Sequence, residues 1–267
     1  MKHLFSVVTT IGVSALVIQT AHASPLFSEA FNYNPGNLVG NVNGSSTWSG
    51  AASTGLQVVS GNLTYPGLAD QGGNELEIIN GSAQTGYIQF ANQTSGQVYY
   101  SFLFNSTAAD SANNYFTALN PGTSVPNGSS DAIDAYYYIS GKMEVRGAAQ
   151  SATAGTGTAL SLNTTYLIVE ELDLDAHTAN LWIDPDSSTF GGTAPTATAS
   201  LSSLTATAVD NVGFKAQSAA GGPYFVDNLL IGTTWADVTP AVPEPSTVAF
   251  VGLGIVGLIS ARRRVRK

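Results

Sequence analysis

The sequence predicts an all-β protein that folds as a two-sheet antiparallel sandwich. Short apolar or alternating runs recur along the chain, and Gly, Asn, Ser and Pro separate them. Between the two ends of the chain, no stretch of useful length repeats its apolar residues with a helical period. Runs of this length with turn residues between them are typical of strands in antiparallel sheets. So many short strands bury their apolar faces most readily by stacking two sheets.

Twelve runs are the expected strands. In chain order they cover residues 26–31, 56–59, 76–79, 87–90, 98–104, 115–119, 135–139, 143–146, 166–172, 179–183, 209–215 and 224–231. Within residues 98–104 the alternation of polar and apolar positions is imperfect, which indicates a strand that is covered on both faces or bent across a concave sheet. Two tracts rich in Ala, Gly, Thr and Ser, residues 148–159 and 191–200, are expected to be mobile surface connections.

Two segments predict how the strands are arranged. Residues 166–172, a polar corner at 173–177 and residues 178–185 have the pattern of a β-hairpin. The run that closes the domain, residues 225–238, has a plausible partner strand in residues 27–31. Together these segments resemble the LamG-like, concanavalin A-like jelly rolls of exported bacterial proteins. The resemblance implies one jelly-roll domain over residues 24–240, in a fold whose members often bind glycans or proteins, sometimes with Ca²⁺.

The first 23 residues have the layout of a secretory signal peptide. Lys2 gives a positive start, an apolar run covers residues 4–18, and Ala21 and Ala23 form a small-x-small cleavage site. We therefore expect cleavage after Ala23 and export of residues 24–240.

Residues 241–267 form a second addressing segment with three parts in a fixed order. The parts are the motif Val242, Pro243, Glu244, Pro245, Ser246, then 15 uncharged residues at 247–261, then the basic cluster Arg262, Arg263, Arg264, Arg266, Lys267. A helix of this length spans only about 22 Å, but basic side chains can reach the interface and mark the cytoplasmic side. A short transmembrane helix with a cytoplasmic C terminus is the expected structure.

This order closely resembles the PEP-CTERM sorting tail of Gram-negative bacteria. The resemblance implies that exosortase, a membrane-embedded sorting enzyme, removes the tail near the motif. It also implies transient anchoring in the inner membrane, followed by a place at the cell surface or in the extracellular matrix. It assigns no catalytic residue to this chain.

Composition excludes several functions for residues 24–240. This part contains 17 acidic residues against Lys142, Arg146 and Lys215, a net charge of −14, which repels nucleic acid. Cysteine is absent, so disulfides, thiolate nucleophiles and Cys-ligated zinc are excluded. His177 is the one histidine of this part, which leaves no multi-histidine metal site. We expect no cofactor, with Ca²⁺ as the one candidate ion.

The acidic residues of the predicted hairpin are the candidate catalytic groups. Glu171, Asp173 and Asp175 stand at alternate positions, so on a strand their carboxylates would share one face, as in a retaining glycosidase. The pattern resembles the Glu-x-Asp-x-Glu motif of laminarinase-type hydrolases, with Asp175 in the position of the acid/base Glu. The alternative, which we favour, is that these residues form the solvated end of a hairpin whose turn begins at Asp173.

Two further groups of residues have a functional and a structural interpretation. Oxygen ligands for Ca²⁺ are offered near one loop by Asp173, Asp175, Asp184 and Asp186, although such clusters are usually only solvated. Sugar-stacking faces are offered by Trp48, Trp182, Trp235 and the tyrosines at 136–138, although Trp182 alternates with apolar neighbours as a core residue does.

The sequence as a whole favours a non-enzymatic exported protein of the cell surface or extracellular matrix. Its sandwich is expected to bind carbohydrate or another surface component, or to contribute structurally to the matrix. One alternative is a glycoside hydrolase or polysaccharide lyase on the same fold. The other is a module for protein–protein adhesion.

Overall fold

The computed structural model describes residues 24–51, 54–81, 83–109, 114–128, 131–137, 140–147, 153–155, 159–217 and 221–242. The predicted signal peptide, motif residues Pro243, Glu244, Pro245 and Ser246, the predicted transmembrane helix and the basic cluster lie outside them. Within the described ranges, no helix is long and apolar enough to cross a membrane.

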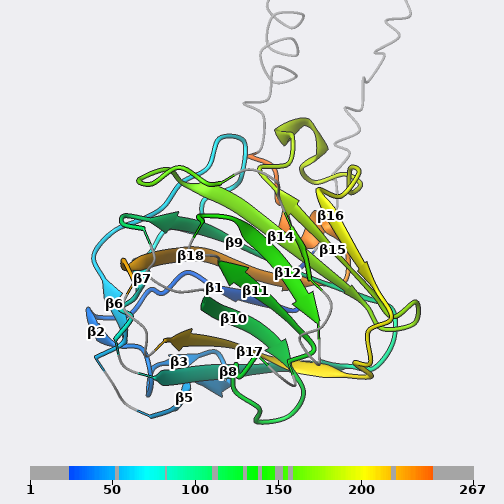
Figure 1. Ribbon diagram of the computed structural model, residues 1–267. Helices are drawn as coiled ribbons and strands as arrows, with labels where there is room; N and C mark the ends of the chain where they lie inside the picture. Colours follow the sequence, from blue (N-terminus) through cyan, green and yellow to red (C-terminus); the bar gives the residue numbers. More distant parts are fainter. Residues whose placement is uncertain are drawn as a thin grey trace, which may run out of the picture.

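Two stacked antiparallel sheets make up the described protein (Figure 1). The larger sheet has the spatial order β16 (Ala199–Ser202), β15 (Thr178–Ile183), β14 (Tyr166–Asp173), β9 (Gln97–Ser106), β18 (Tyr224–Gly232), β7 (Glu75–Ile78), β6 (Leu56–Val59), β2 (Gly36–Asn37), and β1 (Phe27–Glu29) also pairs with β18. The smaller sheet has the order β13 (Thr153–Gly155), β12 (Met143–Gly147), β11 (Ile133–Tyr137), β10 (Asn114–Asn120), β17 (Val209–Ala216), β8 (Gln84–Gln93), β5 (Ser49–Gly50). The predicted two-sheet antiparallel jelly-roll sandwich is confirmed.

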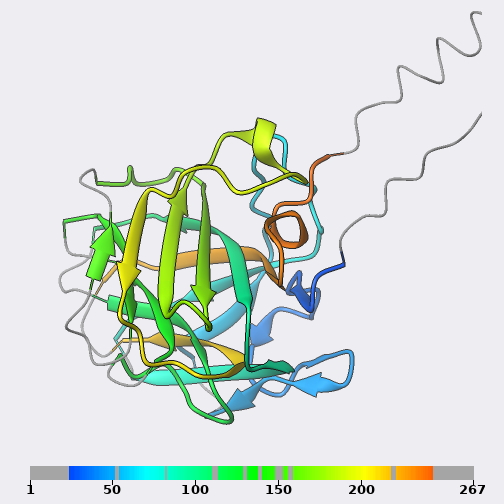
Figure 2. The ribbon, with the colours of Figure 1, turned by 90° about the vertical axis from the view of Figure 1, so that its right-hand side faces the viewer.

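A small third sheet, β3 (Val42–Asn43) with β4 (Ser46–Thr47), forms a hairpin that projects from one side of the sandwich (Figure 2). Gly44 has φ 60° and Ser45 does not have positive φ, which suits a two-residue hairpin turn with Gly first. The hairpin meets the body through Ser46, whose Oγ donates a 2.8 Å hydrogen bond to the carbonyl oxygen of Gln89 on β8.

The two predicted pairings are present. In the β14–β15 hairpin, Asp173 pairs with Thr178 and Ile168 pairs with Ile183. At the start of the chain, β1 pairs with β18, so that Phe27 lies opposite Ile231. Because β18 is the last strand, this pairing brings the two ends of the domain side by side.

The core between the sheets is rich in aromatic rings. Phe104 and Tyr224 from the larger sheet contact Phe116 and Tyr137 from the smaller one, with ring centroids 5.1 to 5.6 Å apart. Such pairs add to the free energy gained by burial of the rings. All four rings are at most 1% exposed, so the two sheets are firmly joined.

A second apolar layer covers the outer face of the larger sheet. Tyr99, Trp182 and Trp235 meet there, and the two indole rings lie 5.1 Å apart. Trp235 begins the helix α1 (Trp235–Val238), which has a capping box between Thr234 and Asp237. β9 and β14 therefore have buried residues on both faces, as the imperfect alternation in residues 98–104 predicts.

Each of the twelve predicted runs contains a strand, and the differences lie in the segments between them. β16 begins at Ala199, inside the tract 191–200, and the Thr198 backbone N–H already donates to the Leu181 carbonyl oxygen at 2.7 Å. The end of that tract is therefore sheet edge rather than a surface connection. β13 likewise lies within the tract 148–159. Neither tract has the bulky apolar residues by which a strand is recognised in a sequence.

Candidate functional site

The three acidic residues predicted as catalytic candidates lie at one end of the β14–β15 hairpin. Glu171 is on β14, is only 4% exposed, and accepts a 2.8 Å hydrogen bond from Nδ2 of Asn180. Burial raises the pKa of Glu171, against the lowering effect of that hydrogen bond. Asp173 ends the strand and accepts the backbone N–H of Asp175 at 3.0 Å. Asp175 is exposed and accepts the backbone N–H of Gly96 at 3.0 Å. The two aspartates therefore accept hydrogen bonds that shape the turn and its neighbour.

The four predicted calcium ligands are divided between the two ends of β15. Asp173 and Asp175 precede this strand, whereas Asp184 and Asp186 follow it. Six residues of strand separate the pairs by about 20 Å, so they do not lie near one loop as the sequence suggests. Asp184 accepts the Leu167 backbone N–H at 3.0 Å, and Asp186 caps a short 3₁₀ helix. Among the described residues, no three His, Cys, Asp or Glu side chains are grouped as a metal site.

The tryptophans suggested as sugar-stacking faces are buried. Trp48, Trp182 and Trp235 are at most 3% exposed, and Tyr137 is 1% exposed. The core interpretation of Trp182 is confirmed, although it packs in the outer layer rather than between the sheets. Because no face of these rings is open to solvent, they cannot stack on a sugar.

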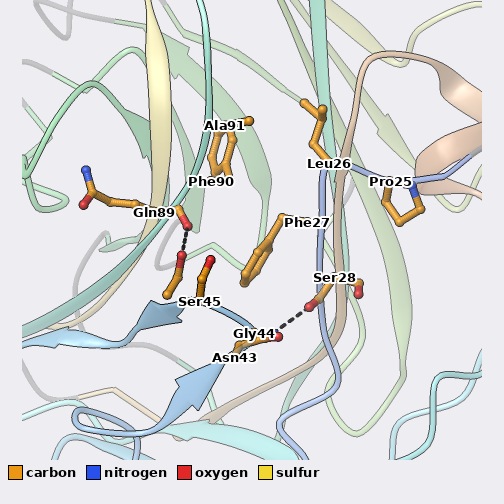
Figure 3. A pocket seen from close by; sticks show the side chains of 11 residues that line it. Pro25, Leu26, Phe27, Ser28, Asn43, Gly44, Ser45, Gln89, Phe90 and Ala91 are labelled. Carbon is orange, nitrogen blue, oxygen red and sulfur yellow. Dashed lines mark hydrogen bonds between the residues drawn. The ribbon is translucent and has the colours of Figure 1, made fainter.

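A pocket of about 490 Å³ lies where the first strand, the projecting hairpin and β8 meet (Figure 3). Three segments line it, and they are far apart in the sequence. Their residues are Pro25, Leu26, Phe27, Ser28, Asn43, Gly44, Ser45, Ser46, Gln89, Phe90 and Ala91. The apolar members include the rings of Phe27 and Phe90, which are partly exposed and pack on the core behind them.

Glu29 holds the wall of this pocket in place. Its carboxylate is 2% exposed and accepts hydrogen bonds from Nε1 of Trp48 at 2.9 Å, from the hydroxyl of Tyr33 at 2.6 Å and from Nδ2 of Asn43 at 3.1 Å. Asn43 Nδ2 also donates to the carbonyl oxygen of Ser28 at 2.7 Å (Figure 3). One buried carboxylate therefore joins β1 to the projecting hairpin.

A second, smaller pocket of about 280 Å³ adjoins the first. Ser28, Asn43 and Gly44 line both pockets, and the smaller one continues along Glu29 and Tyr33. Burial and the adjacent Glu29 carboxylate raise the pKa of Tyr33 well above its ordinary value, so this hydroxyl stays protonated and acts as a donor. The two pockets therefore meet at Ser28, Asn43 and Gly44.

The chemistry of the larger pocket is polar and uncharged. None of its 11 lining residues has an ionisable side chain. Hydroxyls are supplied by Ser28 and Ser45, both exposed, and Asn43 Oδ1 has no hydrogen bond within the described structure. Uncharged donors and acceptors beside partly exposed rings suit a ligand with hydroxyl groups on an apolar ring.

Sequence reasoning missed this pocket because each segment by itself is unremarkable in composition. The local signal was the Gly44-Ser45 pair between two short runs, which is typical of a tight hairpin turn. No periodicity indicates that residues 43–46 would lie beside residues 25–28 and 89–91. That proximity depends on the pairing of the first and last strands.

Comparison with known proteins identifies the C-terminal segment. Residues 241–264 match the PEP-CTERM protein-sorting motif, which confirms the predicted sorting tail. No curated protein matches the chain.

Several solved structures are similar in their strand arrangement. A sialidase gives a TM-score of 0.49 at 11% identity over 80% of this chain and 19% of its own length. Lectin II from Ulex europaeus gives 0.44 at 11% identity over 78% of this chain and 99% of its own. Trypanosoma rangeli sialidase in complex with 2,3-difluorosialic acid gives 0.42 at 10% identity over 75% of this chain and 31% of its own. The chain thus spans about a fifth to a third of the two sialidases, and the likeness assigns it neither a ligand nor an activity.

Proposed function

We propose that this is an exported surface or matrix protein whose sandwich binds a neutral carbohydrate in the pocket between β1, the β3–β4 hairpin and β8. The sorting motif at residues 241–264 implies an exported protein processed by exosortase. Carbohydrate binding is supported by one observation above the others, the uncharged lining of hydroxyl, amide and phenylalanine groups.

The charge of the domain favours a neutral ligand over an acidic one. Residues 24–240 have a net charge of −14, and none of the three basic residues among them lines the pocket. A polysaccharide with uronate or phosphate groups would be repelled by this surface at low salt. A neutral sugar experiences no such repulsion and can use the serine and asparagine groups as hydrogen-bond partners.

The expected route places the domain outside the inner membrane. In this proposal a signal peptide directs export, residues 247–261 span the membrane, and the arginine cluster remains cytoplasmic until exosortase removes the tail. The released domain then remains at the cell surface or in the matrix of a Gram-negative bacterium.

A glycan array with the purified protein, repeated with EDTA, tests the proposal. We expect binding to neutral glycans that survives EDTA, and titration with the best of them should be weakened at least about tenfold by Phe90→Ala, which removes about 1.4 kcal/mol or more of contact. Leu162→Ala is the control, because Leu162 is 41% exposed and does not line the pocket. Binding restricted to acidic glycans, or equal affinity in both variants, would disprove this assignment.

A further inference from the structure

Three carboxamide side chains lie in a row across the outer face of the smaller sheet. Gln89 on β8 is the strand partner of Asn211 on β17, and Asn211 is the partner of Asn120 on β10. Directly opposite residues point to the same face of a sheet, so the three amides are neighbours. Gln89 also lines the pocket, and its side chain extends away from Phe27 (Figure 3).

The inner part of this row is buried and incompletely hydrogen-bonded. Asn120 and Asn211 are both 0% exposed. Neither Oδ1 nor Nδ2 of Asn120 has a partner among the described residues, and Oδ1 of Asn211 has none either. Buried amide atoms are almost always hydrogen-bonded in native proteins, because loss of hydration is unfavourable without a replacement. These two adjacent side chains therefore have polar atoms that are available to a ligand.

The residues that cover the row belong to the same chain. Residues 121–128 follow β10, and two of them lie over this face: Gly122 bonds to the row and Pro126 lies against Gly213 of β17. The Gly122 carbonyl oxygen accepts hydrogen bonds from Nδ2 of Asn211 at 2.9 Å and from Nε2 of Gln89 at 3.2 Å. The Gly122 N–H donates to Oδ1 of Asp210, which stands at a bulge of β17 beside Asn211.

The bonded groups of Gly122 have the connectivity of a sugar diol. In glycine the nitrogen and the carbonyl oxygen are separated by two carbon atoms, Cα and C. In a vicinal diol the two oxygens are likewise separated by two carbon atoms. The Gly122 carbonyl oxygen accepts from the two amides, and the Gly122 N–H donates to the Asp210 carboxylate. Two adjacent hydroxyls of a sugar can bind the same three partners.

We propose that Asp210, Asn211, Gln89 and Asn120 form a second saccharide subsite, which Gly122 occupies as an internal substitute for a vicinal diol. The subsite takes a neutral oligosaccharide long enough to extend from the Figure 3 pocket, with which it shares Gln89. In this respect it rests on the proposed function. When residues 121–128 move aside, the sugar replaces Gly122 and also reaches the free amide atoms of Asn120.

Two contacts hold residues 121–128, here called the cover, over the amide row. Each contact can be disrupted by a single substitution. Gly213 lies beneath Pro126, and a Cβ added at Gly213 would lie 2.5 Å from Pro126 Cδ. Gly213→Ala must therefore displace the cover without changing any residue of the row. Gly122 itself has φ 64°, which proline cannot adopt, and Gly122→Pro also removes the N–H that binds Asp210.

The experiment measures calorimetric binding of hexasaccharides of the gluco, manno and galacto series, and of the matching monosaccharides, to the purified protein. We expect Gly213→Ala to strengthen binding of at least one hexasaccharide about tenfold. In this variant the cover is already displaced, so binding no longer includes the free-energy cost of moving it. Monosaccharide binding should not change. Adding Asn120→Ala to Gly213→Ala should abolish the gain. The control is Gly96→Ala, which introduces the same methyl group at a residue with φ 71°. A Cβ added there would have no atom within 4 Å.

Side-chain amide exchange, followed by NMR, reports whether the cover has moved independently of any sugar. The subsite is overturned if Gly213→Ala or Gly122→Pro speeds exchange at Asn120 and Asn211 but no hexasaccharide binds more tightly. It is also overturned if the gain in hexasaccharide affinity survives Asn120→Ala. If neither variant speeds exchange or gains affinity, the cover is a fixed part of the fold and the proposal fails. Wild-type monosaccharide binding and its loss in Phe90→Ala test the pocket separately, so either site can fail without the other.

Discussion

The indole Nε1 of Trp48 donates a 2.9 Å hydrogen bond to Oε2 of Glu29, and both side chains are almost completely buried. Trp48 packs against Phe31 and Phe214 in the core, while Glu29 binds the projecting hairpin through Asn43. This pair connects the sandwich core to the wall of the proposed sugar pocket. A change at Glu29 should therefore affect stability and ligand binding together.

Glu29→Ala should lower the free energy of unfolding by about 3 kcal/mol, because it leaves the buried donors of Trp48 and Phe31 without an acceptor. It should also weaken sugar binding by releasing Asn43. Urea denaturation and calorimetric titration measure the two effects. Glu77→Gln, on the partly exposed side of β7, is the control and should change neither. Full stability with normal binding in Glu29→Ala would exclude this connecting role.

Tyr100 and Glu170 form a fully buried pair in the core, with the tyrosine hydroxyl 2.6 Å from Oε2 of Glu170. Glu170→Leu alone should destabilise by about 1–3 kcal/mol, since it leaves the Tyr100 hydroxyl unpaired. Tyr100→Phe combined with Glu170→Leu should recover most of that loss, because an apolar pair needs no hydrogen bond. A double-mutant cycle of unfolding free energies tests this, and strictly additive losses would show that the pair is not coupled.

Stability should fall as the pH rises from about 4 to about 7. Burial, with the neighbouring Glu75 and Asp70 carboxylates, raises the pKa of Asp227 from 3.8 to about 7. The folded protein therefore binds a proton more tightly than the unfolded chain. The stabilising contribution is complete below the unfolded pKa and is lost as the pH rises through the folded one.

Urea midpoints measured across this pH range should show the decline. Asp227→Asn should make it shallower and leave the part that comes from Asp134, because burial also raises the pKa of Asp134 to about 7. Asp175→Asn is the control, because Asp175 is exposed. A midpoint in the wild type that rises with pH over this window, or one that declines equally in Asp227→Asn, would contradict the assignment to Asp227.

The wild-type protein should hydrolyse no laminarin or related β-glucan. Glu171→Gln and Asp175→Asn should leave folding and sugar binding nearly unchanged, since the Gln and Asn side chains retain an oxygen for the hydrogen bonds from Asn180 and Gly96. Reducing-end assays and circular dichroism measure the outcomes. Turnover that either substitution abolishes would instead support a glycoside hydrolase.

A cytoplasm-specific reporter fused to the C terminus should be active until the tail is processed. Arg262, Arg263 and Arg264 favour the cytoplasmic side of the membrane. Replacing Pro243, Glu244 and Pro245 by alanine should preserve the reporter signal and keep the protein in the membrane fraction, because the sorting motif is then absent. A reporter active only on the outer side would overturn this topology.

The sequence alone determined the strands, the hairpin and the sorting tail. Residues 166–173 and 178–183 were predictable because the period of a strand and the polar corner between strands are local properties. The sorting tail was predictable for the same reason, since its motif, apolar stretch and arginine cluster are contiguous. The acidic side chains at 171, 173 and 175 were also visible, as was the corner that follows them. The structure differs from the interpretation as a solvated hairpin end in two respects, because Asp173 still pairs with Thr178 as the last strand residue and Glu171 is buried.

Tertiary structure alone decided which residues line the proposed pocket and subsite. Phe27, Asn43 and Phe90 come together because β1 pairs with β18 and Ser46 of the projecting hairpin bonds to β8, contacts between residues distant in the sequence. The amide row at Gln89, Asn211 and Asn120 likewise depends on the register of three strands. A shift of one residue in any of them would turn its amide to the other face, and local sequence does not fix the register between distant strands.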